Sequence, residues 1–148
     1  MEFFNYEAHQ KLWMLLKDSI HVAARENYAG NGYYNAYNAL EKLKKELLCL
    51  HFSAEERNPR NYCFCCQAAM FYQEANWIND EEIHCEYCPL QWPEQLHCDE
   101  NGSLYRKLID CLEANDIIGA AAICVEIADV KPYDEEEFEK MIFKEVSK

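Results

Sequence analysis

Four cysteines in two Cys-x-x-Cys pairs are the residues of this sequence best suited to chemistry. Cys63 and Cys66 form the first pair, and Cys85 and Cys88 form the second pair after a gap of 18 residues. The turn in such a pair directs two thiolates at one ion, and two pairs complete the tetrahedral site that Zn²⁺ prefers. Because four thiolates leave no open coordination position, the sequence predicts a structural Zn²⁺ ion rather than a catalytic one.

Other potential ligands lie close to these four cysteines. Cys65 could replace Cys66 in a tighter pair, and Cys98 or His97 could displace one of the four. If Cys66 opens the helix that follows it, its thiolate gains from the helix N-terminus, which favours Cys66 over Cys65.

The remaining cysteines and the N-terminus indicate the compartment. Cys49, Cys111 and Cys124 lie on or near apolar helical stripes, so we expect them to be small core residues. Nine cysteines without a secretory signal favour thiols and metal bonds over disulfides. The most apolar run, residues 117–125, is far shorter than the roughly 20 residues that span a bilayer. We therefore expect a soluble, cytoplasmic protein.

No catalytic motif stands out. His84-x-Glu86 resembles half of the zinc-deaminase signature, but the Pro-Cys-x-x-Cys that should follow is missing. The sequence also lacks a phosphate loop, a dinucleotide-binding Gly-x-Gly-x-x-Gly, a His-Glu-x-x-His and a nucleophile elbow. We predict no catalytic residues and no enzymatic activity.

The charge of the cysteine segment is strongly negative. The chain has 27 acids against 14 Lys and Arg, and residues 61–105 contain no Lys or Arg at all. Such a surface repels phosphates and acidic membranes and suits a basic groove, where it can imitate nucleic acid. For any single acid, a solvated position that aids solubility is an equally good interpretation. The acids that we predict to bind a partner are Asp80, Glu81, Glu82, Glu86, Glu94, Asp99 and Glu100.

The elements that position these residues are predicted to be helices. The apolar pattern predicts a helix over residues 6–28 and, after the Gly30–Gly32 break, a second one. In the second helix, Glu41 and Lys45 are spaced to pair on the outer face. Its inner face should carry Ala36, Leu40, Leu43, Leu47 and Leu50, and its outer face Lys42, Lys44 and Lys45.

Helices are also predicted through the rest of the chain. A short one should lie within residues 67–77, and two more should follow an irregular segment, with a joint at Asn115–Asp116. Asp134 should cap a last helix, with Glu137 three residues on. The predicted inner residues are Leu104, Leu108, Cys111 and Leu112, then Ile118, Ala121, Ala122 and Val125, then Phe138, Met141, Ile142 and Val146.

The predicted fold class is therefore mainly α. We expect a single domain over residues 1–148, with N-terminal helices (1–60), a loop-rich, zinc-stapled module of the zinc-knuckle or ribbon type (61–102) and C-terminal helices (103–148).

The cysteine segment resembles an uncharacterised group of small phage and prophage proteins. The shared residues are Cys63-Phe64-x-Cys66, Cys85-x-x-Cys88-Pro89-Leu90-x-Trp92-Pro93 and Cys98, with His9-x-x-Leu12-Trp13 near the start. A final helix that closes at Pro132 is matched loosely. The chain departs from the group in residues 29–60, in the extra Cys65 and in the acidic tail. The resemblance implies a viral origin and a zinc module, but no reaction.

These observations give three hypotheses of function. The first is a phage-encoded inhibitor that binds a basic surface of a host protein, as an anti-CRISPR-like or DNA-mimicking anti-defence protein would. The second is a regulatory zinc ribbon that binds nucleic acid through Lys42, Lys44, Lys45, Arg57 and Arg60. The third is a capture protein for a signalling nucleotide. We favour the first, because the cysteine segment lacks the cations that would neutralise phosphates.

Overall fold

The computed structural model describes residues 4–28, 33–56, 64–76, 88–95 and 100–146. Within these ranges, the side chains of residues 26–28, 33, 34, 66, 67, 70, 71, 95 and 141–146 are not described. The described residues form six α-helices and the short 3₁₀ helix η2 (Pro93–Gln95), with an isolated β-bridge in place of any sheet. The mainly α class is thus confirmed.

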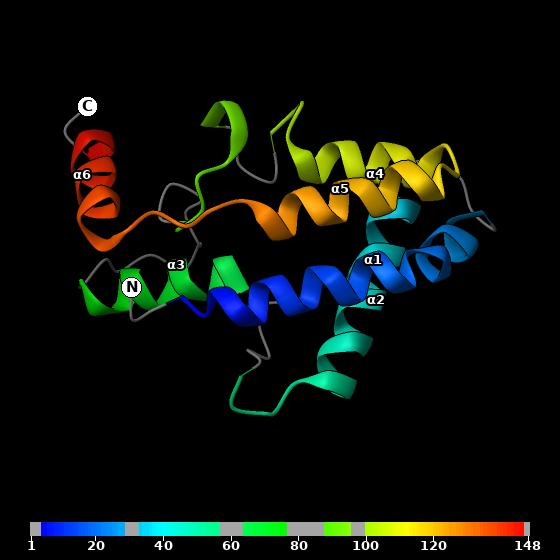
Figure 1. Cartoon of the computed structure of the whole chain (residues 1–148), viewed down its shortest axis with the longest axis horizontal. Coiled ribbons are helices and arrows are strands. Elements are labelled where there is room, and N and C mark those ends of the chain that lie inside the picture. The colour runs from blue at the N-terminus through cyan, green and yellow to red at the C-terminus, as the bar shows by residue number, and fades with distance from the viewer. Residues whose placement is uncertain (1–3, 29–32, 57–63, 77–87, 96–99, 147–148) are drawn as a thin grey trace.

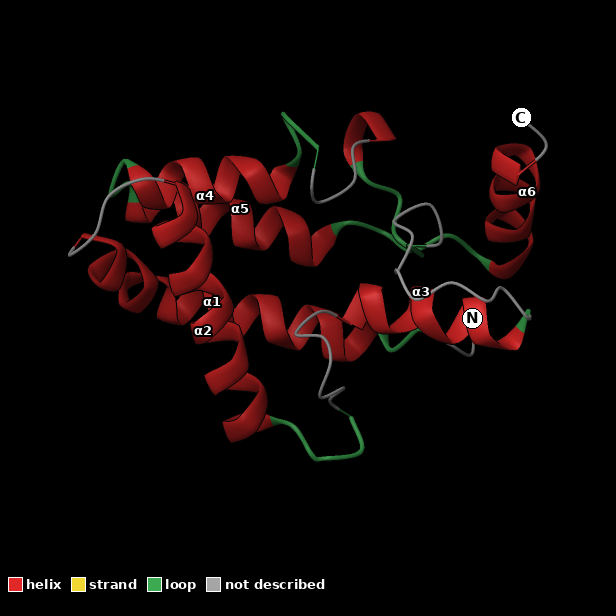
Figure 2. Cartoon of the chain, turned by 180° about the vertical axis from the view of Figure 1, so that it is seen from behind, coloured by secondary structure: helices red, strands yellow, loops and turns green. Residues whose placement is uncertain are grey.

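Four helices form the main bundle. α1 (Tyr6–Tyr28) packs along α5 (Ile117–Asp129) and α2 (Tyr33–His51), and α5 packs on α4 (Leu104–Glu113). α1 and α5 run antiparallel on one side of the molecule, with α2 and α4 behind them (Figures 1 and 2). The core is a continuous apolar cluster that includes Leu12, Leu16, Ile20, Leu40, Leu108, Ile109, Leu112 and Ile127.

α2 contains all the residues predicted for the second helix, but two of its side chains lie on the opposite face from the predicted one. Leu50, predicted to face inward, is 77% exposed, because the last turns of α2 project beyond the other helices (Figures 1 and 2). Lys44, predicted to face outward, is only 3% exposed. The predicted pair of Glu41 and Lys45 is also wrong, since Glu41 pairs with Lys44.

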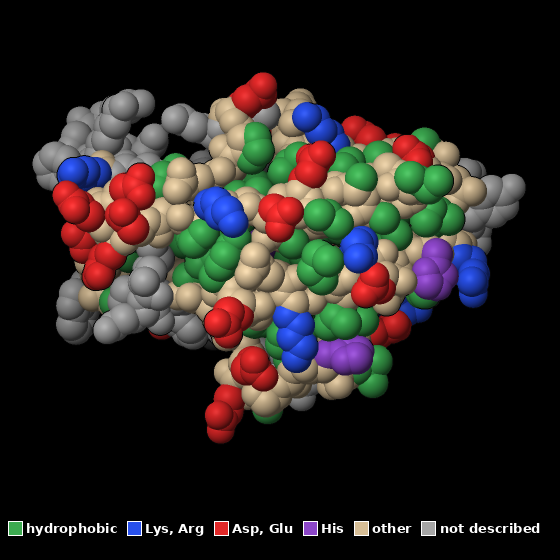
Figure 3. All heavy atoms as spheres, in the orientation of Figure 1, with side chains coloured by type: hydrophobic (Ala, Val, Ile, Leu, Met, Phe, Trp, Pro, Cys, Tyr) green, Lys and Arg blue, Asp and Glu red, His purple; other side chains and the backbone are tan. Residues whose placement is uncertain are grey.

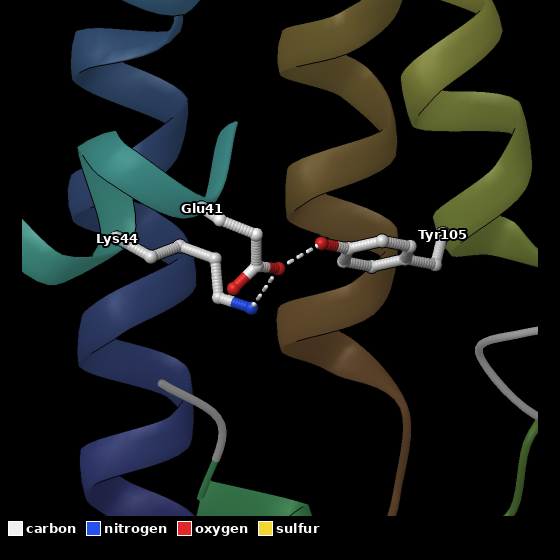
Figure 4. A network of polar contacts seen from close by, with 3 residues as sticks. All are labelled: Glu41, Lys44 and Tyr105. Atoms are coloured by element: carbon white, nitrogen blue, oxygen red, sulfur yellow. Dashed lines mark hydrogen bonds and ion pairs between the residues drawn. The ribbon is translucent and has the colours of Figure 1, made fainter. Parts of the chain in front are cut away.

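Lys44 is buried because polar and aromatic groups surround its ammonium group. Its Nζ lies 3.1 Å from Glu41 Oε1, and the Tyr105 hydroxyl on α4 donates to the same carboxylate oxygen (Figure 4). The ammonium also lies 5.3 Å from the ring centre of Tyr105 and 5.9 Å from that of Trp13 on α1. Cation–π attraction and an ion pair thus offset the loss of hydration, and the network joins three helices.

α5 is turned differently from its prediction. Ile118, expected in the core, is 86% exposed, and the buried residues are Ala120, Cys124, Ile127 and Ala128. The hydrophobic periodicity does not predict which face of α5 is buried, because Glu126 and Asp129 are the only charged residues in this helix. The joint before α5 is as predicted: Asp116 is its N-cap and accepts a hydrogen bond from the Gly119 amide at 2.9 Å.

α3 (Phe64–Ala75) and α6 (Glu135–Val146) lie together at one end of the bundle (Figure 1). α3 begins three residues before its predicted start. α6 is capped as predicted, with the Glu137 amide donating to Asp134 Oδ1 at 2.7 Å, and Phe138 is buried. Among the described residues, no helix is both long and apolar enough to cross a membrane.

Candidate metal centre

The described part of the predicted metal centre is built around Cys88. This residue is only 7% exposed, and the indole Nε1–H of Trp92 donates to its sulfur at 3.3 Å. An N–H donor stabilises negative charge on sulfur, as in the Cys-x-x-Cys turns of zinc sites. The described surroundings of Cys88 therefore suit a thiolate ligand.

The backbone around Cys88 is held by the segment that links α5 to α6. Leu90 and Pro132 form an antiparallel bridge, in which the Gln91 amide donates to Lys131 O and the Tyr133 amide donates to Pro89 O, both at 2.8 Å. The Gln91 side-chain amide also donates to Pro132 O at 3.0 Å. We call the paired residues 88–92 and 131–133 the clamp. Leu90, 2% exposed, fixes the clamp in the core.

Tyr133 belongs to the clamp, where its amide pairs with Pro89. Burial raises the pKa of Tyr133, and the proximity of Cys88 and Glu137 raises it further. The phenol of Tyr133 therefore stays neutral and adds no negative charge beside the cysteine.

The first turn of α3 carries two cysteines, and the side chain of Cys65 is the one that the structure describes. The Cys65 sulfur is buried and lies 3.6 Å from His9 Nδ1 on α1. His9 Nε2 lies 3.0 Å from the carbonyl oxygen of Ile127 on α5, which can only accept, so Nε2 carries a proton. In the neutral ring Nδ1 then accepts from the Cys65 thiol. Cys66, the third residue of α3, occupies the first turn as predicted for a ligand at a helix N-terminus.

The other predicted ligands lie outside the described residues. Cys63, Cys85, His97 and Cys98 belong to ranges that the structure does not describe, and only the backbone of Cys66 is described. Within the described residues, no group of three or more His, Cys, Asp or Glu side chains could hold a metal ion. The four-cysteine zinc site thus stays a prediction, and the donor set that it names fits structural zinc.

The remaining cysteines depart partly from their predicted places. Cys124 is fully buried, and its burial, with Cys111 nearby, raises its pKa to about 12. Cys111 is half-buried, and its pKa is raised by burial and by Asp116 and Asp110. The prediction for Cys49 is wrong: this residue is exposed, because it lies on the outer side of the projecting end of α2.

The acidic surface contains residues that are not among the predicted partner-binding acids. Of the predicted partner-binding acids, Glu94 and Glu100 are exposed, whereas Asp80, Glu81, Glu82, Glu86 and Asp99 lie outside the described residues. In addition, α6 begins with three exposed acids, Glu135, Glu136 and Glu137. Acidic side chains gather over this end of the molecule (Figure 3). The signal in the sequence for these residues is the run of acids after Asp134.

The basic stripe of the nucleic-acid hypothesis is interrupted. Lys44 is buried in the network with Glu41, so it cannot contact a phosphate, while Lys42 and Lys45 are exposed. Arg57 and Arg60 lie outside the described residues. The described cations of α2 therefore form a weaker phosphate-binding surface than the sequence indicated.

The comparisons with known proteins give no relative from which to transfer a function. No family model matches the chain, and no curated protein or solved structure is significantly similar to it.

Proposed function

We propose that the chain is a phage- or prophage-encoded protein that binds a basic surface of a host protein and inhibits it. In this proposal the host protein is one that handles nucleic acid, such as a defence nuclease, and the chain occupies its phosphate-binding groove. The placement of negative charge is the observation that carries the proposal.

Three of the exposed acids follow one another at one end of the molecule. α6 begins with Glu135, Glu136 and Glu137, and it lies beside α3 in the cysteine segment. Residues 61–105 contain eight acids and no Lys or Arg. Lys140 pairs with Glu136 at 3.0 Å, so the acids of this turn are only partly neutralised. Clustered carboxylates present repeated negative charge, as a nucleic-acid backbone does. A basic groove is the complementary surface.

In the same proposal, one structural zinc ion supports the segment. The ligands would be Cys63, Cys66, Cys85 and Cys88, with Trp92 donating its N–H group to the last of them. The position of Cys66 in the first turn of α3 and the burial of Cys88 support this choice. The hydrogen bond between Cys65 and His9 favours Cys66 over Cys65 as the ligand of the first pair.

The test uses affinity capture from lysate of a candidate host at physiological salt, followed by elution with duplex DNA. A partner that is captured by the wild-type chain and released by DNA supports the proposal. The Glu135→Gln, Glu136→Gln, Glu137→Gln triple variant should capture at least about 10-fold less of it, because three charges leave the surface.

A second triple variant controls for net charge alone. Glu46, Glu55 and Glu113 are exposed on α2, on the turn that follows it and at the end of α4, so their change to Gln removes the same charge elsewhere. We expect this variant to capture the partner as the wild type does. Equal capture by both triple variants, or a partner that DNA does not release, would contradict the proposal.

A further inference from the structure

The outer side of α5 is an exposed apolar surface. Residues 117–125 contain only Ile, Val, Ala, Gly and Cys. We call three of them the α5 ridge: Ile118 and Ala122, which are exposed, and the half-buried Val125, whose spacing places them on one side of the helix. Figure 3 shows apolar side chains gathered over the face that α1 and α5 form. A helix that is apolar all round is normally buried all round, so the ridge is suited to contact with another protein.

Both an acid and a cation lie at the N-terminal end of the ridge. Asp116 is the N-cap of α5. α1 runs antiparallel to α5, and His9 Nε2 lies 3.0 Å from Ile127 O. Lys17 follows His9 by eight residues, so it is level with the first turn of α5, because the two helices rise equally per residue. The Lys17 ammonium lies 3.3 Å from Asp18, but both side chains are accessible to solvent, and such a pair is weak.

The C-terminal end of the ridge also offers acids and a cation. Asp129 is the last residue of α5, Glu126 lies in the same turn and Lys131 follows directly after the helix, and all three are exposed. The chain has a formal net charge of -13, so most of its surface repels a second copy. An uncharged ridge with a cation at each end is where two copies can approach each other with little repulsion.

We propose that a second copy of the chain covers the α5 ridge, with the two α5 helices packed antiparallel about a twofold axis. Such an axis brings the N-terminal end of one ridge to the C-terminal end of the other. Lys17 of one protomer then faces Asp129 of its partner, and Asp116 faces Lys131, so each pairing of opposite charges occurs twice. Because the ridge is short, the dimer is weak and forms reversibly at high protein concentration.

The dimer changes how the acidic helix is displayed. α6 lies at the end of the bundle where α5 ends (Figure 1). An antiparallel twofold arrangement therefore places the two copies of Glu135, Glu136 and Glu137 at opposite ends of the dimer. This goes beyond the proposed function, because one dimer then presents two separate acidic surfaces.

Sedimentation velocity over a concentration series, at physiological salt and under reducing conditions, tests the inference. We expect the wild type to shift from monomer to dimer as its concentration rises. Ile118→Asp places a charge on the ridge and should raise the dimer Kd at least about 10-fold. Leu50→Asp makes the matched change at the exposed end of α2 and should leave the Kd within about 2-fold of the wild-type value.

An exchange of charges tests the antiparallel arrangement. Lys17→Glu and Asp129→Lys should each raise the Kd at least about 3-fold, because like charges then face each other across the axis. The double variant restores opposite charges and should return the Kd to within about 2-fold of the wild-type value. None of the substituted positions is buried, so circular dichroism should show the wild-type helix content in every variant.

Three outcomes overturn the inference. The first is wild-type protein that stays monomeric up to its solubility limit. The second is a dimer that Ile118→Asp leaves intact, because its interface then lies elsewhere on the molecule. The third is a double charge variant that associates as weakly as the single variants, because the two helices are then not paired antiparallel.

Discussion

Cys65 and His9 join two helices that are distant in sequence: the thiol on α3 lies 3.6 Å from Nδ1 of the imidazole on α1. Both side chains are buried, and His9 is also fixed to the backbone of α5 through Nε2. A thiol, an imidazole and a carbonyl thus connect the cysteine segment to the two long helices of the bundle. Cys65 in this position contributes to the buried interior.

The Cys65→Ala variant should lower the free energy of unfolding by about 1 to 3 kcal/mol, because a buried polar ring loses one of its hydrogen bonds. Chemical denaturation measures this change. Cys49→Ala, at an exposed position, should stay within about 0.5 kcal/mol of the wild type. Equal stability of the two variants would show that the contact between Cys65 and His9 contributes nothing.

Zinc content should distinguish Cys88 from Cys65. Wild-type protein and Cys65→Ala should each hold about one zinc ion per chain, whereas Cys88→Ser should lose most of it, because a serine hydroxyl is a poor replacement for a thiolate ligand. Elemental analysis of protein purified under reducing conditions measures the ratio. Loss of zinc from Cys65→Ala, with retention in Cys88→Ser, would reverse our assignment of ligands.

Lys44 should contribute to the free energy of unfolding, whereas Lys45 should contribute little. Lys44→Met leaves the partly buried carboxylate of Glu41 without its ion pair and should destabilise the protein by about 1 to 3 kcal/mol, less than a fully buried pair would. Lys45→Met, on the exposed side of α2, should change stability by less than about 0.5 kcal/mol. Thermal unfolding compares the two. The opposite order would support the pair of Glu41 and Lys45.

Two isoleucines of α5 provide a matched test of its orientation. Ile127 is fully buried and Ile118 is 86% exposed, so the same change to alanine should have very different effects. Ile127→Ala should cost about 2 to 5 kcal/mol, through lost burial and the cavity that remains. Ile118→Ala should be nearly neutral in chemical denaturation. Similar losses in both variants would indicate that α5 is turned differently.

Cys124 should make the protein sensitive to alkaline pH. Its thiol has a pKa of about 12 in the folded protein, against an ordinary value of 9.0. The contribution of the neutral thiol to the free energy of unfolding is therefore fully present below pH 9. It is lost as the pH rises toward 12, by at most about 1.4 kcal/mol per pH unit.

The difference in unfolding free energy between wild type and Cys124→Ala isolates this effect, since most other titrating groups are common to both. We expect the unfolding free energy of the wild type, relative to that of Cys124→Ala, to decrease steadily above pH 9 in denaturant titrations. A difference that does not change with pH would show that the buried thiol does not titrate in this way.

Local signals in the sequence define the helices and several of their ends. The span of α1, the cap at Asp134 and the joint at Asp116 follow from local signals, because hydrophobic periodicity, side-chain capping and turn residues act within a few positions of the chain. The prediction that Cys66 lies in the first turn of a helix also rests on neighbouring residues of the chain. The four-cysteine zinc site was also derived from spacing, and it remains a prediction.

Which helix faces are buried, and which distant segments meet, depends on packing between the elements. α5 is apolar almost all round, so its orientation depends on α1 and α4, and the burial of Lys44 depends on Trp13 and Tyr105 from two other helices. The clamp and the contact between Tyr72 and Phe138 join residues at least 40 positions apart, which no local pattern encodes. Packing between distant segments thus placed Phe138 of the acidic helix against Tyr72 of α3, because a helix with one apolar side takes its position from the surface that covers that side.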